Sequence, residues 1–284
     1  MRRSIVLSLA VLVLAAPVRA DPALVVFMSD FGHQDDSVAI CKGAMLSLSP
    51  QLHIVDLTHD VSPWAIADGA RFLAGAAPSF PEGTVFVGVV DPGVGTNRRA
   101  VVARNARHQR FVVPDNGLLT LLDGLLEVRA LTNEAWFAPH RSATFHGRDV
   151  FAPAAARLAA GADFGEAGPV ISDWVRLELP KVTRTPGALG GEVVAVEAPY
   201  GNLVTNLPGD EAKALGPKLR VRFGRQAALV LPFVDTFGDV PRGQPLAYVD
   251  SRGRLAFAVN AGSFAARYKV TASTSLHVEA AKRR

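Results

Sequence analysis

Cysteine and charge are both scarce in this sequence of 284 residues. Cys41 is the single cysteine, which excludes a disulfide framework and any cysteine-rich zinc module. Only 20% of the residues are charged whereas 49% are hydrophobic, and this apolar share excludes an intrinsically disordered chain. The length is sufficient for two modest domains or one large one.

Long apolar runs are also missing, except near the N-terminus. Residues 1–20 (MRRSIVLSLAVLVLAAPVRA) place two arginines before an apolar run that ends in a small-residue cleavage pattern. This arrangement predicts a secretory signal peptide, and therefore an exported, periplasmic or secreted protein without membrane contact after cleavage. An uncleaved interfacial anchor is the alternative, because the run is too short to favour a membrane-spanning helix.

A basic surface is not expected after cleavage. Loss of residues 1–20 removes three arginines and changes the formal net charge from +4 to +1. The remaining run of Lys and Arg is 282–284, so the sequence lacks the electrostatic signature of a nucleic-acid-binding protein.

The pattern of apolar runs changes along the chain and predicts two folds. In the first part strands alternate with helices, which favours an α/β fold with a mostly parallel sheet between helices. The expected strands are 23–29, 52–57 and 84–90, and the expected helices are 37–48, 65–77 and 150–160. In the second part, short β-like runs separated by Gly and Pro predict a smaller antiparallel β-barrel or sandwich. These runs are 192–196, 219–223, 227–231, 245–249, 255–259 and 268–272.

The predicted domain boundaries follow from this change of pattern. Segment 182–191 is rich in Pro, Gly and Thr and is expected to be a linker. The predicted organisation is therefore a signal peptide (1–20), an N-terminal α/β/α domain (21–181), the linker, and a C-terminal β-barrel domain (192–284).

Acidic residues follow three of the predicted strands. Asp30, Asp56 and Asp91 stand at or near the carboxyl ends of these strands. Ligands of open α/β sheets bind at that edge, and carboxylates there indicate recognition of hydroxyl groups or of a cation rather than of phosphate. Metal ligation is not expected, because segments 29–36 and 53–60 contain neither HExxH nor an EF-hand spacing.

The segment 91–99 (DPGVGTNRR) offers the clearest chemistry. Its two glycines permit a tight turn, and its pattern differs from that of a phosphate-binding loop. Asp91 and Arg98 are expected to form an ion pair that keeps the carboxylate charged and oriented, with a plain turn and a surface ion pair as the alternative. His146 precedes an Ala-rich helix and is compatible with a general base, a ligand or a packed polar residue.

Two segments of the second part are compatible either with ligand binding or with ordinary turns. In 200–206 (YGNLVTN), Tyr200 can stack on an adenine while Asn202 reads its edge. Ser251 and Arg252 lie between two predicted strands and can face a ligand carboxylate.

Together, seven motifs resemble those of the S-adenosyl-L-methionine hydroxide adenosyltransferases, which are related to fluorinase and chlorinase. The motifs are SDFG (29–32), DLTHDVSPW (56–64), VVDPGVGTNRR (89–99), PDNGLL (114–119), TFHGRD (144–149), YGNLVTN (200–206) and SRGRLAFAVNAG (251–262). The resemblance implies an N-terminal α/β/α domain, a C-terminal β-barrel, and a homotrimer with its active sites at the subunit interfaces. It also implies hydrolysis of S-adenosyl-L-methionine to adenosine and L-methionine, without a metal or a cofactor.

The resemblance further assigns roles to residues. The catalytic set falls on Asp91, Arg98 and His146, with either Asp91 or His146 as the acceptor of the proton from water. The implied substrate contacts are Asp30 (ribose hydroxyls), Trp64, Glu197, Tyr200, Asn202, Ser251, Arg252 and the backbone at Ala261. Glu197 stands where relatives carry Asp, and Val259 stands where fluorinase carries Arg.

Two other functions are compatible with these motifs. An exported, noncatalytic adenosyl-ligand-binding protein is favoured by the signal peptide, because the substrate is made in the cytoplasm. A 5′-halogenase is disfavoured by Asp91, where halogenases carry Tyr, and by the short connection 105–109. His146-Gly147 likewise replaces the Tyr-Ser of fluorinase. An ionised carboxylate at the attack position would repel a halide.

Overall fold

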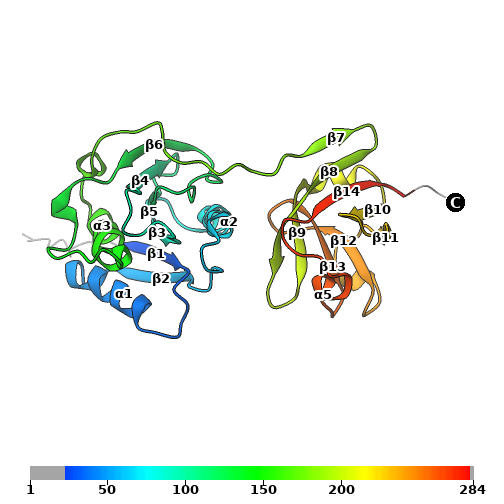
Figure 1. The fold of residues 1–284 in the computed structure, drawn as a ribbon, viewed down its shortest axis with the longest axis horizontal. Coiled ribbons are helices and arrows are strands. Elements are labelled where there is room, and N and C mark those ends of the chain that lie inside the picture. Colours follow the sequence, from blue (N-terminus) through cyan, green and yellow to red (C-terminus); the bar gives the residue numbers. More distant parts are fainter. Residues whose placement is uncertain (1–22, 282–284) are drawn as a thin grey trace, which may run out of the picture. The chain divides into compact units, whose positions relative to one another are not determined.

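The computed structural model describes residues 23–281, which divide into two units by the density of their contacts. The first unit runs to Trp64 and includes Ser79–Asp115 and Asp123–Trp174. The second comprises Ala65–Pro78, Asn116–Leu122 and the chain from Val175 onward. Figure 1 colours the elements of both units along the sequence.

The predicted signal peptide, 1–20, and the basic run 282–284 lie outside the described residues. Within 23–281, no helix is both long enough and apolar enough to cross a membrane.

A six-stranded sheet forms the centre of the first unit. In spatial order its strands are β2 (His53–Thr58), β1 (Leu24–Ser29), β3 (Val85–Val89), β5 (Arg110–Pro114), β4 (Ala100–Asn105) and β6 (Leu125–Ala130). The first four strands run parallel, whereas β4 is antiparallel to both β5 and β6. The prediction of a mostly parallel sheet is confirmed, with an antiparallel edge added to it.

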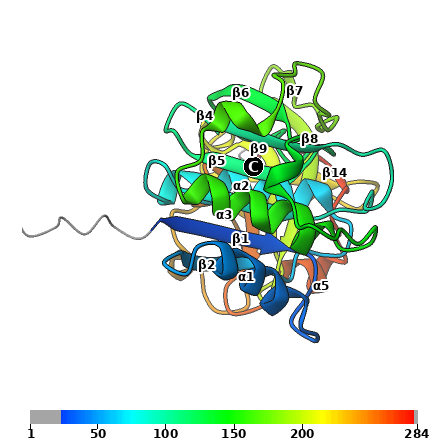
Figure 2. The ribbon, with the colours of Figure 1, turned by 90° about the vertical axis from the view of Figure 1, so that its left-hand side faces the viewer.

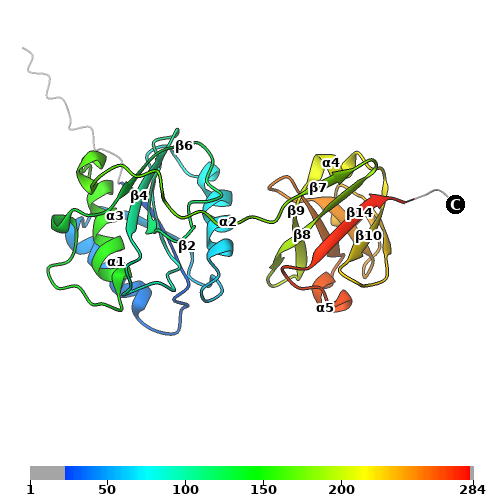
Figure 3. The same ribbon diagram turned by 45° about the horizontal axis from the view of Figure 1, so that its top comes forward.

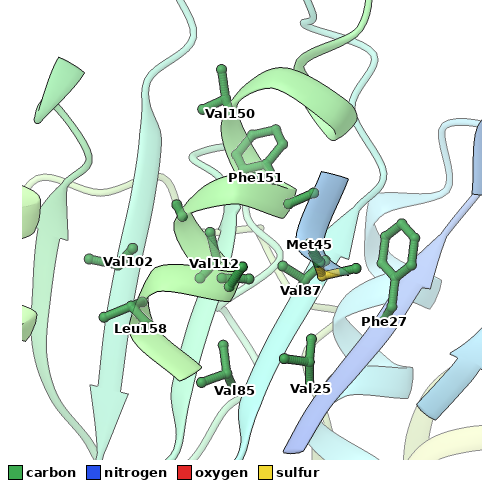
Figure 4. Packing of buried hydrophobic residues seen from close by; sticks show 14 of the residues in the cluster. Val25, Phe27, Met45, Val85, Val87, Val102, Val112, Val150, Phe151 and Leu158 are labelled. Atoms are coloured by element: carbon green, nitrogen blue, oxygen red, sulfur yellow. The ribbon is translucent and has the colours of Figure 1, made fainter. Parts of the chain in front are cut away.

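Helices α1 (Ser37–Leu48) and α3 (Ala152–Ala159) pack on one face of this sheet, and α3 continues a π-helical turn, η3 (Gly147–Phe151) (Figure 2). The many alanines of α3 let its backbone approach closely, so larger side chains from both elements interdigitate. Buried side chains of this core, drawn in Figure 4, are Val25, Phe27, Met45, Val85, Val87, Val102, Val112, Val150, Phe151 and Leu158. Both predicted helices are confirmed here.

The second unit is a nearly closed antiparallel sheet. Its spatial order is β11 (Leu229–Pro232), β10 (Lys218–Phe223), β14 (Ser275–Ala280), β8 (Ala188–Glu197), β9 (Asn202–Pro208), β13 (Arg254–Val259) and β12 (Pro245–Val249), with β7 (Thr183–Thr185) paired to β8 (Figure 3). A single parallel bridge between Phe233 and Ala247 joins the two edges. The rings of Phe223, Phe257 and Phe264 pack together inside, with centroids 5.2–5.8 Å apart. The predicted C-terminal β-barrel is confirmed.

Short helical elements complete the described chain. They are α2 (Ile66–Ala76), α4 (Gly209–Lys213), α5 (Phe264–Tyr268) and the 3₁₀ turns η1 (Ala77–Ser79), η2 (Glu134–Trp136), η4 (Phe164–Ala167) and η5 (Phe237–Asp239).

Two segments differ from the predictions. Segment 182–191, expected to be a linker, contains a β-hairpin of β7 with the start of β8, turning at Gly187, whose φ is +74°. The prediction of a strand over 268–272 is wrong, because Tyr268 is the last residue of α5 and Lys269 is its C-cap. The Ser263 side chain caps α5 by accepting a hydrogen bond from the Ala266 amide, and left-handed Lys269 ends it.

Candidate active site

A tight turn after β3 carries Asp91 and is pressed against a second loop. Backbone hydrogen bonds from Val94 to Asp91 and from Thr96 to Gly93 close the turn. Gly95 has a φ of +77°, and a Cβ at this position would lie 2.7 Å from the carbonyl oxygen of Ala143. Glycine is therefore required here on two grounds, and its contact brings the Asp91 turn close to the loop that precedes His146.

Arg98 lies at the centre of the resulting cluster. Its Nε donates to Asp91 Oδ1 at 3.0 Å and one terminal nitrogen donates to Asp91 Oδ2, so the predicted ion pair is present and bidentate. The side chains of Asp91 and Arg98 are only 5% and 8% exposed. The guanidinium also donates to the Arg99 carbonyl oxygen and lies over the Phe151 ring. These contacts fix a charged carboxylate in one orientation.

His146 completes the cluster through the same guanidinium. The Nη2 atom of Arg98 lies 3.2 Å from His146 Nδ1. Because a guanidinium can only donate, Nδ1 must accept, and a neutral imidazole then carries its proton on Nε2. Partial burial and the positive charge of Arg98 lower the pKa of His146 below its usual value. The imidazole is therefore neutral near pH 7.

The loop around His146 is itself held by local contacts. Asp149 accepts hydrogen bonds from the Ser142 amide and from both Nε and Nη2 of Arg148. A Cβ on Gly147 would lie 2.9 Å from the Phe31 ring, so only glycine lets η3 start against the segment that follows β1. The His146 loop is thereby packed beside the loop that carries Asp30.

Asp30 and Trp64 are brought together in the first unit. The Trp64 amide donates to Asp30 Oδ2 at 3.0 Å, and the Asp30 amide donates to the Val89 carbonyl oxygen at the end of β3. Trp64 adopts a φ of +65°, and it is 73% exposed. A bulky residue in this conformation is strained, and such strain is concentrated at ligand-binding sites.

The other predicted contact residues lie on turns of the second unit. Glu197 and Asn202 are paired across the β8–β9 hairpin, whose tip presents Tyr200 at 69% exposure. At this tip Gly201 has a φ of +68°, and a Cβ there would lie 2.0 Å from Ser263 Oγ. The hairpin tip is therefore seated on the N-terminus of α5.

The β12–β13 turn carries Ser251 and Arg252, both exposed. Asp250 Oδ1 accepts hydrogen bonds from the amides of Arg252 and Arg254, which holds the turn in place. Ala261 follows β13 with a φ of +56°, a left-handed conformation that is uncommon for a residue other than glycine.

The sequence did not single out two features of these regions. In the second unit, Nη1 of Arg71 lies 4.0 Å from Glu197 Oε1, at the limit of an ion pair. In the first unit, Ser29 and His59 are joined by a hydrogen bond between fully buried side chains. For the contact of Arg71 with Glu197, the available signal in the sequence was the spacing of Asp68 and Arg71, three residues apart on one helix.

Asp56 and His59, which belong to the segment 53–60 considered above for metal ligation, form hydrogen bonds with other side chains. Asp56 forms hydrogen bonds with Lys42 and His59. Over the residues that the structure describes, no group of three or more His, Cys, Asp or Glu side chains is arranged to hold a metal ion.

Two family models match nearly all of the described chain. The SAM hydroxide adenosyltransferase N-terminal domain matches residues 25–168, and the C-terminal domain of the same family matches residues 191–277. The chain belongs to the SAM hydroxide adenosyltransferase family. The resemblance inferred from the seven motifs is thereby confirmed.

Named relatives of this family align over most of their length. A protein of Salinispora tropica named (R)-S-adenosyl-L-methionine hydrolase is 43% identical over 260 residues, covering 89% of this chain and 97% of the relative. A Thermus thermophilus protein of the same name is 42% identical over 251 residues, covering 84% and 92%. A fluorinase of Actinoplanes is 35% identical over 295 residues, covering 92% and 99%.

Two solved structures share this architecture. An uncharacterised conserved protein of Thermotoga maritima superposes with a TM-score of 0.85 at 35% identity, covering 89% of this chain and 99% of the other. A conserved hypothetical protein of Thermus thermophilus superposes with a TM-score of 0.72 at 38% identity, covering 91% and 100%. The roles of individual site residues stay predictions.

Proposed function

We propose that this protein hydrolyses S-adenosyl-L-methionine to adenosine and L-methionine by in-line attack of water at ribose C5′. The observation that carries the proposal is the buried, bidentate Asp91–Arg98 pair with His146 on the same guanidinium. Relatives that are 42–43% identical and named (R)-S-adenosyl-L-methionine hydrolase support the same substrate.

Asp91 orients the attacking water. Arg98 holds the carboxylate through two hydrogen bonds, and each carboxylate oxygen still has a lone pair that can accept a hydrogen bond from water. The leaving group is a neutral thioether expelled from a sulfonium, so it needs no proton from an acid. Positioning of the water in line with the C5′–S bond is then the main catalytic contribution.

The hydrogen-bond geometry favours Asp91 over His146 as the proton acceptor. His146 Nδ1 is engaged by Arg98, which leaves a proton on Nε2 and makes the imidazole a donor toward the reacting atoms. Attack by water produces a protonated 5′-hydroxyl, which is a far stronger acid than any carboxylic acid. The Asp91 carboxylate can therefore accept this proton.

A halide is a poor nucleophile for this site, although a fluorinase is among the relatives. The Asp91 side chain is 5% exposed and negatively charged, so an anion beside it would be both desolvated and repelled. Water is neutral and gains a hydrogen bond from the same carboxylate. Hydrolysis is therefore preferred over halogenation.

The proposed substrate contacts follow the resemblance to the family. Asp30 accepts hydrogen bonds from the ribose hydroxyls through the carboxylate that also binds the Trp64 amide. The contacts proposed for the second unit are Glu197 to the methionine ammonium, Ser251 and Arg252 to the methionine portion, and Tyr200, Asn202 and the Ala261 backbone around the adenosyl group. A homotrimer with sites between neighbouring subunits is part of the proposal, and light scattering of the purified protein tests it.

Export is the last part of the proposal. Residues 1–20 carry the pattern of a cleaved signal peptide. N-terminal sequencing of protein recovered from the periplasm or medium tests it, and an intact N-terminus retained with the membrane would contradict it.

The decisive experiment uses chain 21–284 incubated with each sulfonium epimer of S-adenosyl-L-methionine. We expect adenosine and methionine in equal amounts, measured by chromatography, and an unchanged rate when fluoride or chloride is added. Calorimetric binding without adenosine formation would instead support a noncatalytic binding protein. Halide-dependent consumption of substrate would support a halogenase.

A further inference from the structure

A chain of four polar side chains lies beneath the predicted ribose contact. Lys42 Nζ of α1 donates to Asp56 Oδ2 of β2 at 2.6 Å, and Asp56 Oδ1 lies 3.1 Å from His59 Nε2. His59 Nδ1 in turn lies 2.7 Å from Ser29 Oγ at the end of β1. Ser29 and His59 are both 0% exposed. The chain therefore joins three elements and runs from the more exposed Lys42–Asp56 pair to the buried Ser29.

The protons of this chain have one consistent order. The Asp56 carboxylate can only accept, so His59 donates from Nε2 and must accept at Nδ1 from the Ser29 hydroxyl. Burial alone would raise the pKa of Asp56, but the hydrogen bonds from Lys42 and His59 outweigh it and lower the pKa. Burial lowers the pKa of His59 despite its contact with Asp56. The imidazole is thus neutral and fixed in one tautomer.

Ser29 is not a nucleophile, although Ser, His and Asp follow one another here. Its side chain has no exposed surface, so no substrate carbon can approach its oxygen. Its hydroxyl oxygen instead accepts a hydrogen bond from the Phe31 amide at 3.3 Å. The side chain of Ser29 therefore ties the backbone on both sides of Asp30 to His59.

Main-chain contacts reinforce the same connection. The Gly32 amide donates to the His59 carbonyl oxygen at 2.7 Å, and the Val61 amide donates to the Ser29 carbonyl oxygen at 3.4 Å. Together with the bond from the Trp64 amide to Asp30 Oδ2, they hold segments 29–32 and 59–64 side by side. Asp30 is the single carboxylate within the clamped segment 29–32.

We propose that His59 is a positioning residue that, through Ser29, aims the Asp30 carboxylate at the two ribose hydroxyls of the substrate. The inference rests on the proposed function only in taking the ligand to be an adenosyl group. It assigns His59, Ser29, Asp56 and Lys42 to substrate discrimination rather than to bond breaking. Their removal should weaken recognition of the hydroxyls while leaving the water-activating cluster of Asp91 intact.

The preference for a ligand with ribose hydroxyls tests the positioning role of His59 and Ser29, and it can be measured without turnover. Calorimetry with adenosine and 2′,3′-dideoxyadenosine compares ligands that differ only in the hydroxyls. The wild type should prefer adenosine on the order of tenfold or more, as expected for hydrogen bonds to a charged group. Ser29→Ala should reduce this preference to roughly threefold or less, with most of the loss on the adenosine side. Asp60→Asn is the matched control, because Asp60 adjoins His59 but contacts the exposed His33.

A double-mutant cycle with Asp30 distinguishes a positioning role of Ser29 from a general loss of structure. Asp30→Ala alone should abolish the preference, and adding Ser29→Ala to it should cause no further loss. Asp56→Ala provides a second variant at the more exposed end of the chain, with the same expected direction. In the wild type, ¹⁵N resonances of His59 should report a proton on Nε2 and none on Nδ1, and Ser29→Ala should shift the Nδ1 resonance.

Each outcome decides the inference. A preference that is unchanged in both Ser29→Ala and Asp56→Ala, or independent losses from Ser29→Ala and Asp30→Ala, would overturn it. So would a wild type that does not distinguish the two nucleosides. A wild type that keeps the preference but releases no adenosine from S-adenosyl-L-methionine would overturn the proposed function alone.

Discussion

The two units hold their candidate site residues in different ways. In the first, Asp91, Arg98 and His146 are joined to one another through side-chain hydrogen bonds, and the ion pair is almost fully buried. In the second, Tyr200 and Arg252 are exposed on turns that are held in place by hydrogen bonds of backbone amides to the main chain and to the Asp250 side chain. The first unit therefore holds charged side chains in fixed orientations, whereas the second unit holds its loops in a fixed conformation.

This difference has a consequence for substitutions. A change in the first unit alters partners as well as the residue itself, because each side chain is bonded to another. A change at an exposed turn side chain of the second unit alters only what that side chain would touch. Stability and activity should therefore be coupled in one unit and separable in the other.

Asp91→Asn should have the largest effect on activity. The substitution keeps the shape but removes the charge that orients water, so adenosine formation should fall by about 10²–10⁴-fold. It also leaves the buried Arg98 without its anion, so a lower free energy of unfolding is expected in urea denaturation. Asp173→Asn is the control, because it removes a carboxylate 73% exposed from another arginine pair in the same unit. Equal losses in both variants would remove Asp91 from the mechanism.

Gly95→Ala should have the second-largest effect on activity. Its comparison with Gly243→Ala tests the difference between the two units. The added Cβ would lie 2.7 Å from the Ala143 carbonyl oxygen at a φ of +77°. Gly243 of the second unit has a φ of +79° and nothing within 4 Å of such a Cβ. Backbone strain alone should cost Gly243→Ala about 1 kcal/mol in stability and leave activity intact. Gly95→Ala should cost more and also lower kcat, because the Asp91 turn must move away from the His146 loop.

Tyr200→Ala should give a smaller and purely ligand-dependent effect. The ring is 69% exposed, so the free energy of unfolding should change by less than about 0.5 kcal/mol. Loss of its stacking on adenine should raise the Kd for adenosine by roughly five- to tenfold, measured by calorimetry. Val230→Ala, at a side chain 59% exposed in the same unit, is the control and should change neither quantity. A marked loss of stability in Tyr200→Ala would contradict the separation of the two units' roles.

The sequence predicts these arrangements only where the contacts are local. Helix α1 spans the predicted residues because its apolar spacing and the acidic residues before it are local signals. The Asp91–Arg98 pair joins residues on one turn, and it too was predictable. The contact of Arg98 with His146 joins residues 48 positions apart, so only the resemblance to a family suggested it. The Ser29–His59 bond, 30 positions apart, was not anticipated at all.

Local patterns can also mislead when a cap overrides them. The short β-like run 268–272 suggested a strand, but α5, capped by Ser263, extends to Tyr268. The glycine-rich segment before β8 suggested a linker, but its left-handed Gly187 makes a hairpin turn. In both cases one residue with a specific local role, the capping side chain of Ser263 or the left-handed backbone of Gly187, shapes the segment, and composition does not reveal it.

The smallest expected effect is a dependence of the Tm on pH that arises from His146 in the first unit. The pKa of His146 is lowered by burial and by Arg98, so the unfolded chain binds the proton more readily than the folded one. The stabilising contribution is therefore present above the usual histidine pKa near 6.5 and is lost as the pH falls through the lower folded value. Between pH 7.5 and 5.5 the Tm should decrease by a few degrees, and His146→Asn should lessen that decrease. His140→Asn, at an exposed histidine outside the cluster, should leave the decrease unchanged. The predicted contacts of the second unit include no histidine, so a decrease that His146→Asn does not alter would place the pH response outside the Arg98 cluster.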